Sequence, residues 1–399
     1  MNPKRKKVLF LTQSFIRYRG DISSAYLHVL AKKILGLGYD VEVLAPHAKD
    51  LLFYEKVENI PIHRFRYGSD RWERLAYQGV MDQLVRKSLI NKLIFVFFLI
   101  SYFWNATKLA KNPEVKLIHA HWWIPTGLVA TLISMIFGKP LMITTHGTDI
   151  RILKPSGISH MLGSFVFKRV SHVTVVSNFL KRKLTSVIPI SPSKVTVRPM
   201  PVNIEQFGPS ERKRKNAKDR KTILCVARYT KQKRLDTLID ALDLLKAEGM
   251  EVNAILIGEG EEEESLKKLI KSKNLTSQVT FLPLMPQGEL NRFYQKSDIV
   301  VLPSVDEGFG LVLVEAQLCR VPVIGADSGG IPDIIVHEKT GLLFPPGDCT
   351  SLANCIKQIL EDERLVSELI SNAYQEARTR FSPESTAKTF VGIYDDLTK

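Results

Sequence analysis

Residues 307–315 read Glu-Gly-Phe-Gly-Leu-Val-Leu-Val-Glu, and the fold expected for the whole chain is organised around this stretch. Residues 298–304 (Asp-Ile-Val-Val-Leu-Pro-Ser) come shortly before it and have the unbroken apolar pattern of a buried strand. Residues 312–319 come shortly after the second glycine and predict a short apolar helix. A strand, a glycine-rich turn and a helix therefore follow one another, which is the repeating element of a parallel sheet with crossover helices.

The glycine-rich turn has the chemistry of an anion site. The first amides of a helix have no acceptor within the helix and attract negative charge, and glycines let a phosphate approach the backbone closely. Glu307 and Glu315 lie roughly 12 Å apart along this segment, at about 1.5 Å per residue. A nucleotide diphosphate sugar could span that gap, with its sugar at one glutamate and its ribose at the other. For this stretch taken alone, two solvated surface glutamates are the alternative.

The positive charge of the chain is concentrated in its first half. The 399 residues are 45% hydrophobic and carry a formal net charge of +15, which suits a soluble protein of two domains. Residues 1–200 contain 30 Lys and Arg against 11 Asp and Glu, whereas residues 201–399 contain 26 against 30. The basic half favours an anionic partner, either an acidic lipid or a phosphorylated substrate. The sequence has no nucleic-acid-binding motif, so nucleic acid is not expected as a partner.

The cysteines and the first residues indicate a cytoplasmic protein. All four cysteines lie in the second half and none forms a Cys-x2-Cys pair, which is typical of a reducing compartment. The basic residues 1–7 lead directly into an apolar segment at 8–12 that reads as a strand. Because no separate apolar segment and cleavage site precede it, we expect no signal peptide.

The longest apolar run, residues 93–104, has two interpretations. It is shorter than the about 20 residues that a membrane-spanning helix needs. The favoured interpretation is a buried helix packed on a sheet. The other is a helix that dips into a bilayer surface, with Arg86, Lys87 and Lys92 near lipid phosphates. The second interpretation would make the protein peripheral at the inner face of the membrane.

The first half alternates strands and helices as a doubly wound sheet does. Residues 8–12, 41–45, 115–121 and 140–145 predict strands, with a helix at 23–37 between the first two. Such sheets bind ligands beyond the carboxyl ends of their strands.

Four residues at these strand ends are candidates, Gly20, His121, His146 and Asp149; an ordinary turn glycine and satisfied or packed histidines are the alternatives. His119, His121 and His146 also suggest a metal, but no carboxylate or cysteine completes a ligand spacing, so none is expected.

The second half repeats this pattern after a polar, basic linker that ends near residue 221. Residues 222–227 predict a strand, and the loop after it carries Arg228 and Lys233 at the start of a helix. Two cations in that position suit a doubly charged diphosphate. Residues 279–282 and 322–324 predict further strands, followed by a turn with Leu284 and by the glycines Gly329 and Gly330.

Together these segments resemble retaining glycosyltransferases with the GT-B fold, of the family-four type. The Glu-x7-Glu stretch at 307–315, the Arg-x4-Lys pair at 228 and 233, and the His-Gly-Thr-Asp segment at 146–149 match motifs of that family in the expected order. The resemblance covers nearly the whole chain. The first loop departs from it, because Arg-Gly-Asp at 19–21 stands where the family usually has two glycines, which puts the role of Gly20 in doubt.

The resemblance implies a role for each matching residue. Arg228 and Lys233 would hold the diphosphate, Glu307 and His146 the donor sugar, and Glu315 the ribose. The other implied donor-binding residues are Phe309, Gly310, Leu311, Leu284, Gly329 and Gly330, and the acceptor-side residues are Gly20, Asp149 and His121. No metal and no cofactor is implied, because the sequence has no Asp-x-Asp segment and the cations would replace a metal.

The resemblance also implies the architecture: an α/β protein of two doubly wound, Rossmann-like domains facing across a cleft. Residues 1–200 would form the acceptor-side domain and residues 201–382 the nucleotide-sugar domain. Residues 383–399 would form a helix that crosses back to the first domain.

The implied function is retaining transfer of a hexose from a UDP- or GDP-sugar to a lipid-linked or glycan hydroxyl, in polysaccharide or glycolipid biosynthesis. An epimerase or a phosphorylase on the same fold and a non-catalytic carbohydrate-binding subunit are the alternatives; length and the lack of a cofactor lysine site disfavour the phosphorylase. The base, the sugar, the acceptor and the oligomeric state stay open.

Overall fold

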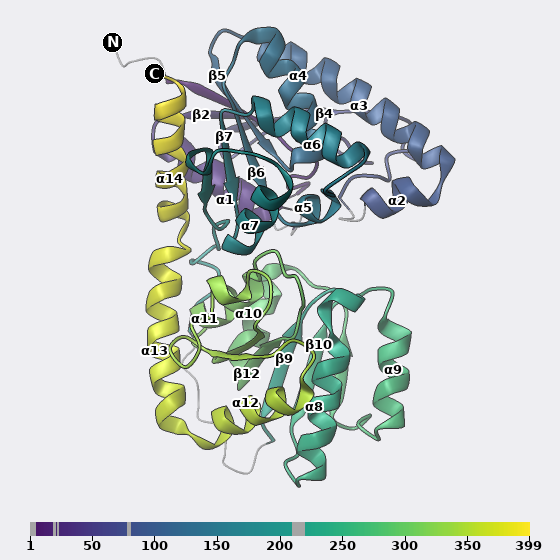
Figure 1. Cartoon of the computed structure of the whole chain (residues 1–399), viewed down its shortest axis with the longest axis vertical. Helices are drawn as coiled ribbons and strands as arrows, with labels where there is room; N and C mark the ends of the chain where they lie inside the picture. Colours follow the sequence, from purple (N-terminus) through teal and green to yellow (C-terminus); the bar gives the residue numbers. More distant parts are fainter. Residues whose placement is uncertain (1–4, 19–20, 22–23, 78–80, 210–219) are drawn as a thin grey trace. The chain divides into compact units, whose positions relative to one another are not determined.

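The computed structural model of the chain describes residues 5–18, 21, 24–77, 81–209 and 220–399. Its internal contacts divide the chain into two compact units (Figure 1). The N-terminal unit comprises Met1–Pro201 together with Pro383–Lys399, and the C-terminal unit comprises Val202–Ser382. The sequence-based division placed the boundary one residue earlier and assigned the same terminal segment to the first domain.

The described part of the N-terminal unit contains an eight-stranded sheet in the order β3-β4-β2-β1-β5-β6-β7-β8. Its strands are parallel except for β3, which pairs with β4 in the antiparallel sense. The strands are β1 (Lys7–Leu11), β2 (Asp40–Pro46), β3 (Tyr54–Val57), β4 (Ile60–Phe65), β5 (Val115–His121), β6 (Leu141–Thr145), β7 (His172–Val175) and β8 (Val195–Val197).

Helices cover the sheet of the N-terminal unit on both faces. Helix α1 (Ala25–Gly36) packs on β2 and on α14 (Pro383–Leu397), and α3 (Leu89–Ala110) packs on β1, β2, β4 and β5. Helix α4 (Leu128–Phe137) packs beside α3 and also contacts α6 (Ile158–Arg169). The remaining helices of this unit are α2 (Met81–Lys87), α5 (Thr148–Ile152) and α7 (Asn178–Val187). Because both faces are covered, the strands can be continuously apolar.

The described residues of the C-terminal unit form a six-stranded parallel sheet in the order β11-β10-β9-β12-β13-β14. Its strands are β9 (Thr222–Val226), β10 (Asn253–Ile257), β11 (Val279–Leu282), β12 (Ile299–Leu302), β13 (Val323–Ala326) and β14 (Leu342–Phe344). Its helices are α8 (Leu235–Ala247), α9 (Glu263–Ser272), α10 (Gln287–Lys296), α11 (Leu311–Leu318), α12 (Cys349–Glu361) and α13 (Glu363–Arg380). All four residues of β12 are buried, as the apolar run at 298–304 predicted.

Each sheet has a topological switch point, where successive strands stop being added on one side of the first strand and continue on its other side. In the C-terminal unit the chain moves outward from β9 to β11 and then returns to β12 on the other side of β9. In the N-terminal unit the corresponding point lies between β1 and β5. Loops that leave the carboxyl ends of the two strands at such a point diverge and form a ligand site. A ligand is therefore expected at the loops after β9 and β12 and at those after β1 and β5.

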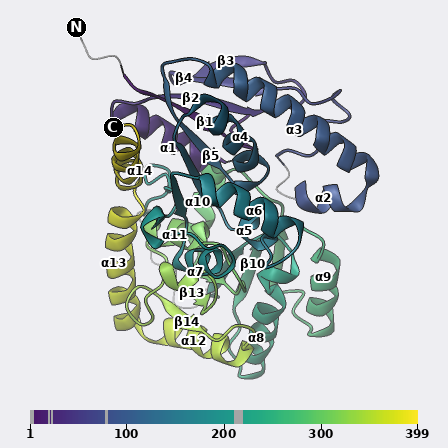
Figure 2. The ribbon, with the colours of Figure 1, turned by 45° about the horizontal axis from the view of Figure 1, so that its top comes forward.

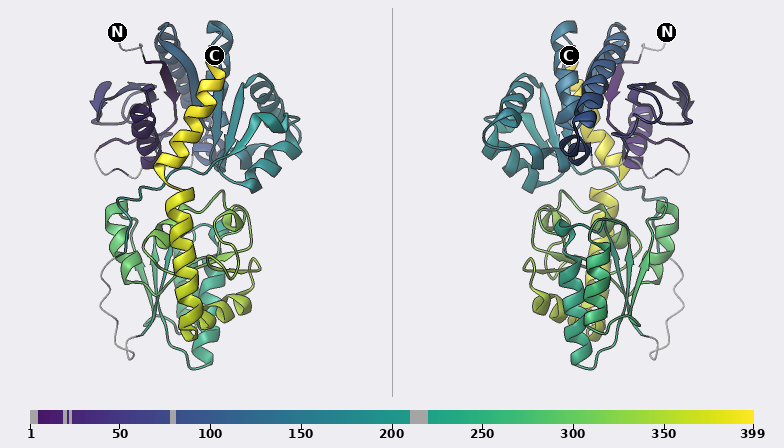
Figure 3. Two further views of the ribbon diagram at one scale, coloured as in Figure 1. Left: turned by 90° about the vertical axis from the view of Figure 1, so that its left-hand side faces the viewer. Right: turned by 90° about the vertical axis from the view of Figure 1, so that its right-hand side faces the viewer.

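The last helix belongs to the N-terminal unit although it follows α13 of the other unit, as predicted (Figure 3). The Tyr39 hydroxyl donates to Asp395 at 2.6 Å, and Arg198 donates to the Ser385 hydroxyl at 2.6 Å. Inside the unit, the Tyr394 hydroxyl lies 2.7 Å from Nδ1 of His119 on β5. Polar contacts thus fix α14 against the strand that ends at His121.

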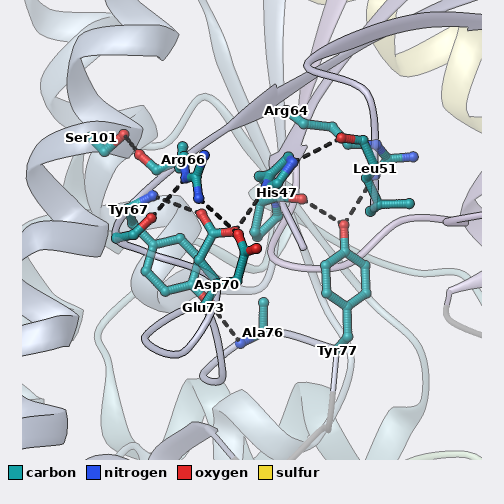
Figure 4. A network of polar contacts seen from close by, with 12 residues as sticks. His47, Leu51, Arg64, Arg66, Tyr67, Asp70, Glu73, Ala76, Tyr77 and Ser101 are labelled. Atoms are coloured by element: carbon teal, nitrogen blue, oxygen red, sulfur yellow. Dashed lines mark hydrogen bonds and ion pairs between the residues drawn. The ribbon is translucent and has the colours of Figure 1, made fainter. Parts of the chain in front are cut away.

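The segment from β2 to α3 was not predicted, and a polar network holds it (Figure 4). His47 Nδ1 lies 2.5 Å from Glu73 Oε2, and Nε2 lies 2.8 Å from the Leu51 carbonyl, so both ring nitrogens face acceptors. Arg64 is 4% exposed and donates to the Tyr77 hydroxyl, the Ile16 carbonyl and Glu55. These contacts tie the loop after β1 to the chain beyond β4.

Helix α3 combines features of both interpretations of the apolar run. By length and composition it is the one helix in the described residues that could cross a membrane. Ile94, Phe98 and Tyr102 are nevertheless completely buried, and the Tyr102 hydroxyl donates to the Thr12 carbonyl at 3.1 Å. The expectation of a helix packed on the sheet is therefore confirmed for this face of α3.

Candidate active site

In the C-terminal unit, most of the candidate residues lie on loops that leave the carboxyl edge of the sheet. Arg228 and Lys233 follow β9, Glu307 follows β12, and Gly329 follows β13. Leu284 follows β11 and is 41% exposed. Because parallel strands end at the same edge, these four loops, which are distant in sequence, lie along one edge of the sheet.

Lys233 and Glu307 form an ion pair across the switch point between β9 and β12. Their side chains are 19% and 15% exposed, so the pair is largely shielded from water. Burial opposes ionisation of Glu307, but the charge of Lys233 together with the hydrogen bonds to the carboxylate outweighs it, and the pKa of the carboxyl is lowered. A fixed cation and a fixed carboxylate therefore stand side by side where a ligand of this fold would bind.

Backbone and side-chain hydrogen bonds join the three loops around this pair. Val305 N donates to the Gln232 carbonyl at 2.9 Å, and Gln232 Nε2 donates to the Asp306 carbonyl at 2.9 Å. Gly330 N donates to the Glu307 carbonyl at 2.7 Å, and Asp306 N donates to the Ser328 hydroxyl at 3.0 Å. The loops after β9, β12 and β13 thus form one connected cradle.

Gly329 is required by this cradle. Its φ is +64°, and a Cβ there would lie 2.4 Å from both the backbone N and O of Glu307. Gly138 has nearly the same φ, +62°, but nothing lies within 4 Å of its Cβ position. The two glycines therefore separate the cost of the backbone conformation from the cost of a collision.

We expect Gly329→Ala to destabilise the protein by about 1–3 kcal/mol more than Gly138→Ala, which carries only the conformational penalty of about 1 kcal/mol. The collision must displace the backbone of Glu307. Urea denaturation of both variants measures the difference. Equal losses of unfolding free energy in the two variants would contradict this, because they would show that the Glu307 loop moves aside at no cost.

Glu315 is not a surface residue. It lies in α11, is 4% exposed, and its carboxylate accepts from the Tyr294 hydroxyl at 2.7 Å and from Gln287 Nε2 at 3.1 Å. Burial raises the pKa of Glu315 to about 7, although the Tyr294 and Gln287 hydrogen bonds act in the other direction. The group is therefore poised to change its charge near neutral pH.

The turn between the two glutamates presents backbone rather than side chains. Phe309 is 5% exposed and its ring packs edge-on against Phe381, with centroids 5.5 Å apart. Gly310 has φ +106° and directly precedes α11, which begins at Leu311. The first amides of that helix lack intrahelical acceptors, so they can bind an anion. Arg228 is exposed on the neighbouring loop after β9.

In the N-terminal unit, His121 ends β5 and His146 directly follows β6, and their side chains lie together. His121 Nδ1 is 3.3 Å from His146 Nε2, and His146 Nδ1 is 3.5 Å from the Tyr26 hydroxyl. The Trp122 ring lies over His146 with centroids 4.4 Å apart, and Trp122 adopts φ +68°, an uncommon conformation for a bulky residue. His121 Nε2 is buried and has no hydrogen-bond partner within the described chain.

The imidazoles of this cluster are neutral at physiological pH. Burial lowers the pKa of His146 to about 3 and holds the pKa of His121 well below its usual value, an effect that His119 and His146 reinforce. A neutral imidazole offers one donor and one acceptor, which suits sugar hydroxyls. Within the described residues, no group of three His, Cys, Asp or Glu is arranged to hold a metal ion.

Asp149 holds the turn after β6 in place. Its carboxylate accepts from the backbone amides of His146 at 3.1 Å, Gly147 at 3.0 Å and Trp123 at 3.1 Å, and the residue is 1% exposed. Its oxygens are thus directed at the backbone that carries the histidine and tryptophan rings. Gly20, the other acceptor-side candidate, lies outside the described residues.

Three residues of these sites were not predicted from the sequence. Tyr26 comes from α1, whereas Gln287 and Tyr294 come from α10. No motif marks them, because their positions depend on which helix packs beside which strand. Tyr294 lies one helical turn beyond Leu290 on the buried side of α10. This spacing predicts that Tyr294 is buried, but it does not predict that its hydroxyl contacts Glu315.

Comparison with known proteins gives two family matches that together span most of the chain. Residues 23–206 match the family described as Glycosyltransferase Family 4. Residues 208–376 match the family described as Glycosyl transferases group 1. The boundary between the matches falls close to the boundary between the two structural units.

Individual relatives agree with these matches. N-acetyl-alpha-D-glucosaminyl L-malate synthase of Bacillus anthracis is 29% identical over 303 residues, which cover 73% of this chain and 77% of the relative. Among solved structures, sucrose-phosphate synthase of Thermosynechococcus elongatus superposes with a TM-score of 0.81 at 21% identity, over 98% of this chain and 99% of the other. Anabaena HepE in complex with UDP and glucose superposes with a TM-score of 0.72 at 22% identity, over 98% and 100%.

Proposed function

Because this chain belongs to the group 1 glycosyltransferases and has the GT-B fold, we propose that it is a retaining hexosyltransferase that uses a nucleotide diphosphate sugar. The proposed acceptor is a hydroxyl of a lipid-linked or glycan molecule, in polysaccharide or glycolipid biosynthesis. One observation carries the proposal furthest: the shielded Lys233–Glu307 pair at the switch point of the C-terminal sheet.

The chemistry of this pair matches the two ends of a sugar diphosphate. An ammonium is a point charge for phosphate oxygens, and a carboxylate accepts hydrogen bonds from sugar hydroxyls. We assign the diphosphate to Lys233, Arg228 and the backbone at Phe309, Gly310 and Leu311. Glu307 would bind the sugar and Glu315 the ribose. Gly329 and Gly330 would shape the cradle, and Leu284 would lie near the base.

The proposed reaction exchanges one bond to the anomeric carbon for another on the same face. The bond to the diphosphate oxygen breaks with its electron pair, and the acceptor oxygen bonds to the anomeric carbon. The acceptor's hydroxyl proton passes to the departing diphosphate. Lys233, Arg228 and the helix amides would stabilise the negative charge that develops there, which is the largest contribution expected in such a reaction. The proposal assigns charge neutralisation to these cations and requires no metal ion or cofactor.

The histidine cluster of the N-terminal unit is the proposed sugar- and acceptor-binding counterpart. Neutral His146 would hydrogen-bond a hydroxyl of the donor sugar, and His121, with its unpartnered Nε2, would face the same ligand. Asp149 would act by positioning the loop of His146, because backbone amides occupy its carboxylate. The nearest alternatives are an epimerase on this fold and a non-catalytic subunit that binds carbohydrate.

The similar proteins support this choice of ligands. The Bacillus anthracis relative is named N-acetyl-alpha-D-glucosaminyl L-malate synthase, and one HepE structure is a complex with UDP-glucose. We therefore expect a UDP-sugar in preference to a GDP-sugar. We further propose that the protein works in the cytoplasm, peripherally bound at the inner face of the membrane.

Thermal unfolding in the presence of UDP-, GDP- and ADP-sugars tests donor binding, because a ligand at 100 times its Kd stabilises a protein by about 2.7 kcal/mol. We expect one nucleotide series to raise the Tm. A radiolabelled sugar of that series should then appear on an acceptor, with retained anomeric configuration and in the presence of EDTA.

The outcome of this assay separates the candidates. Transfer supports the proposal, and conversion of one nucleotide sugar into another would show an epimerase. Donor binding without turnover against a broad panel of acceptors would favour the non-catalytic subunit. Inversion of the anomeric carbon would contradict the retaining mechanism.

A further inference from the structure

The outer face of α3 is an uninterrupted apolar stripe. Leu93, Phe97 and Trp104 are 52%, 45% and 60% exposed, although α3 packs the opposite face into the core. The full stripe consists of Leu89, Ile90, Leu93, Val96, Phe97, Ile100 and Trp104, which recur at helical spacing. A surface helix that is apolar on both faces has one face without a partner in water.

The two helices next in line also carry exposed apolar side chains. Helix α4 packs beside α3 and contacts α6, and the three helices are labelled close together in Figures 1 and 2. Exposed apolar side chains lie at Leu132, Met135 and Ile136 of α4 and at Ile158 and Met161 of α6. We call these residues and the α3 stripe the apolar surface. In the described part of the C-terminal unit, only Leu284 and Val336 are large, apolar and exposed.

The charges carried by α3, α4 and α6 all have one sign. The three helices contain no Asp or Glu, and their exposed charged residues are Lys92, Lys108, Lys168 and Arg169. Helix α2, immediately before α3, carries exposed Asp82 in its first turn and ends in exposed Arg86 and Lys87, which leaves it with a net positive charge. Exposed apolar side chains flanked by cations match a bilayer with anionic headgroups, where the side chains enter the acyl boundary and the cations meet phosphates.

We propose that the apolar surface is the site at which the protein docks on an anionic lipid bilayer. The inference rests on the proposed function only for its purpose, which is to bring a lipid-linked acceptor to the enzyme. Binding itself needs neither donor nor catalysis.

Two other occupants of the apolar surface fit the structure less well. In a symmetric pair of chains the same cationic patch would contribute from both subunits, so like charges would meet without acidic partners. In a spanning arrangement α3 would have to leave the core, yet Phe98 and Tyr102 are fully buried and Asn91 Oδ1 accepts two hydrogen bonds from Arg74. Docking on the bilayer surface removes the exposed face of α3 from water, while the opposite face stays packed in the core.

Co-sedimentation with vesicles tests the proposal on the full-length protein. We expect binding to vesicles of phosphatidylcholine mixed with phosphatidylglycerol, weak binding to phosphatidylcholine alone, and weaker binding at high salt. Leu93→Ser/Phe97→Ser/Trp104→Ser should lower the partition coefficient about a hundredfold, because three large apolar side chains no longer insert. Alkaline carbonate should release the bound protein, as it does for an interfacial protein.

The matched control removes three exposed apolar side chains elsewhere, Leu37→Ser/Leu52→Ser/Val336→Ser, and should bind vesicles like the wild type. Thermal unfolding checks that both triple variants fold. Lys233→Ala should also bind normally, so a failure of the proposed catalysis leaves this result intact. Equal binding of both triple variants, absence of wild-type binding, resistance to carbonate, or a dimer that the first variant dissociates would overturn the proposal.

Discussion

Replacing Lys233 by alanine is expected to lower the rate of glycosyl transfer by a factor of about 10²–10³. The ammonium lies beside Glu307 at the switch point, where the proposed diphosphate leaves with its charge. Removing one preorganised donor from a site of developing charge costs the transition state more than the bound substrate. Single-turnover measurements at saturating donor would therefore show the loss in the chemical step.

The same substitution also breaks a shielded ion pair, so its effect on folding must be separated from its effect on catalysis. Lys233→Ala leaves the Glu307 carboxylate without its cation, whereas Lys233→Ala/Glu307→Gln leaves no buried charge and should recover part of the lost stability. The double variant should not recover the rate of glycosyl transfer.

Lys231 provides the matched control for the Lys233 prediction. It is exposed two residues earlier on the same loop, and Lys231→Ala should retain nearly full activity. A Lys233→Ala enzyme with normal turnover would contradict the assigned diphosphate role.

The central part of the fold could be predicted because parallel strands buried on both faces leave an unmistakable signal. The run at 298–304 contains β12, and the expected helix at 312–319 differs from α11 by one residue at each end. The predicted turn, with its two glycines, lies between them. Local chemistry decides such elements, since apolar periodicity and glycine conformations act over a few residues.

What could not be predicted depends on contacts between distant segments. The β3–β4 hairpin and the segment up to residue 77 are held in part by hydrogen bonds of His47 with Glu73 and of Arg64 with the Ile16 carbonyl, which join residues 26 and 48 positions apart (Figure 4). The sequence likewise left Glu315 open between a surface residue and a ligand group. Its burial and its raised pKa follow from Tyr294 and Gln287 of α10, which no spacing rule connects to it.

This raised pKa leads to a prediction with opposite signs for stability and for binding. Between its ordinary value of 4.5 and about 7, Glu315 holds a proton in the folded chain that the unfolded chain has released. The resulting stabilisation is present at low pH and is lost as the pH rises through 7. Relative to Glu315→Gln, whose amide does not titrate, the wild type should lose about 2–3 kcal/mol of unfolding free energy between pH 5 and pH 8.

Donor affinity should change in the other direction. Ribose hydroxyls donate to the ionised carboxylate, so binding selects the form of Glu315 that is scarce at pH 5 and dominant at pH 8. The affinity for a UDP-sugar should therefore rise about a hundredfold over that range, whereas Glu315→Gln should show weak binding with little pH dependence. Calorimetry with the UDP-sugar is the suitable measurement, because its diesterified diphosphate does not titrate in this range. A wild-type affinity that is flat with pH would remove Glu315 from the ribose site, while the stability difference alone would still report its burial.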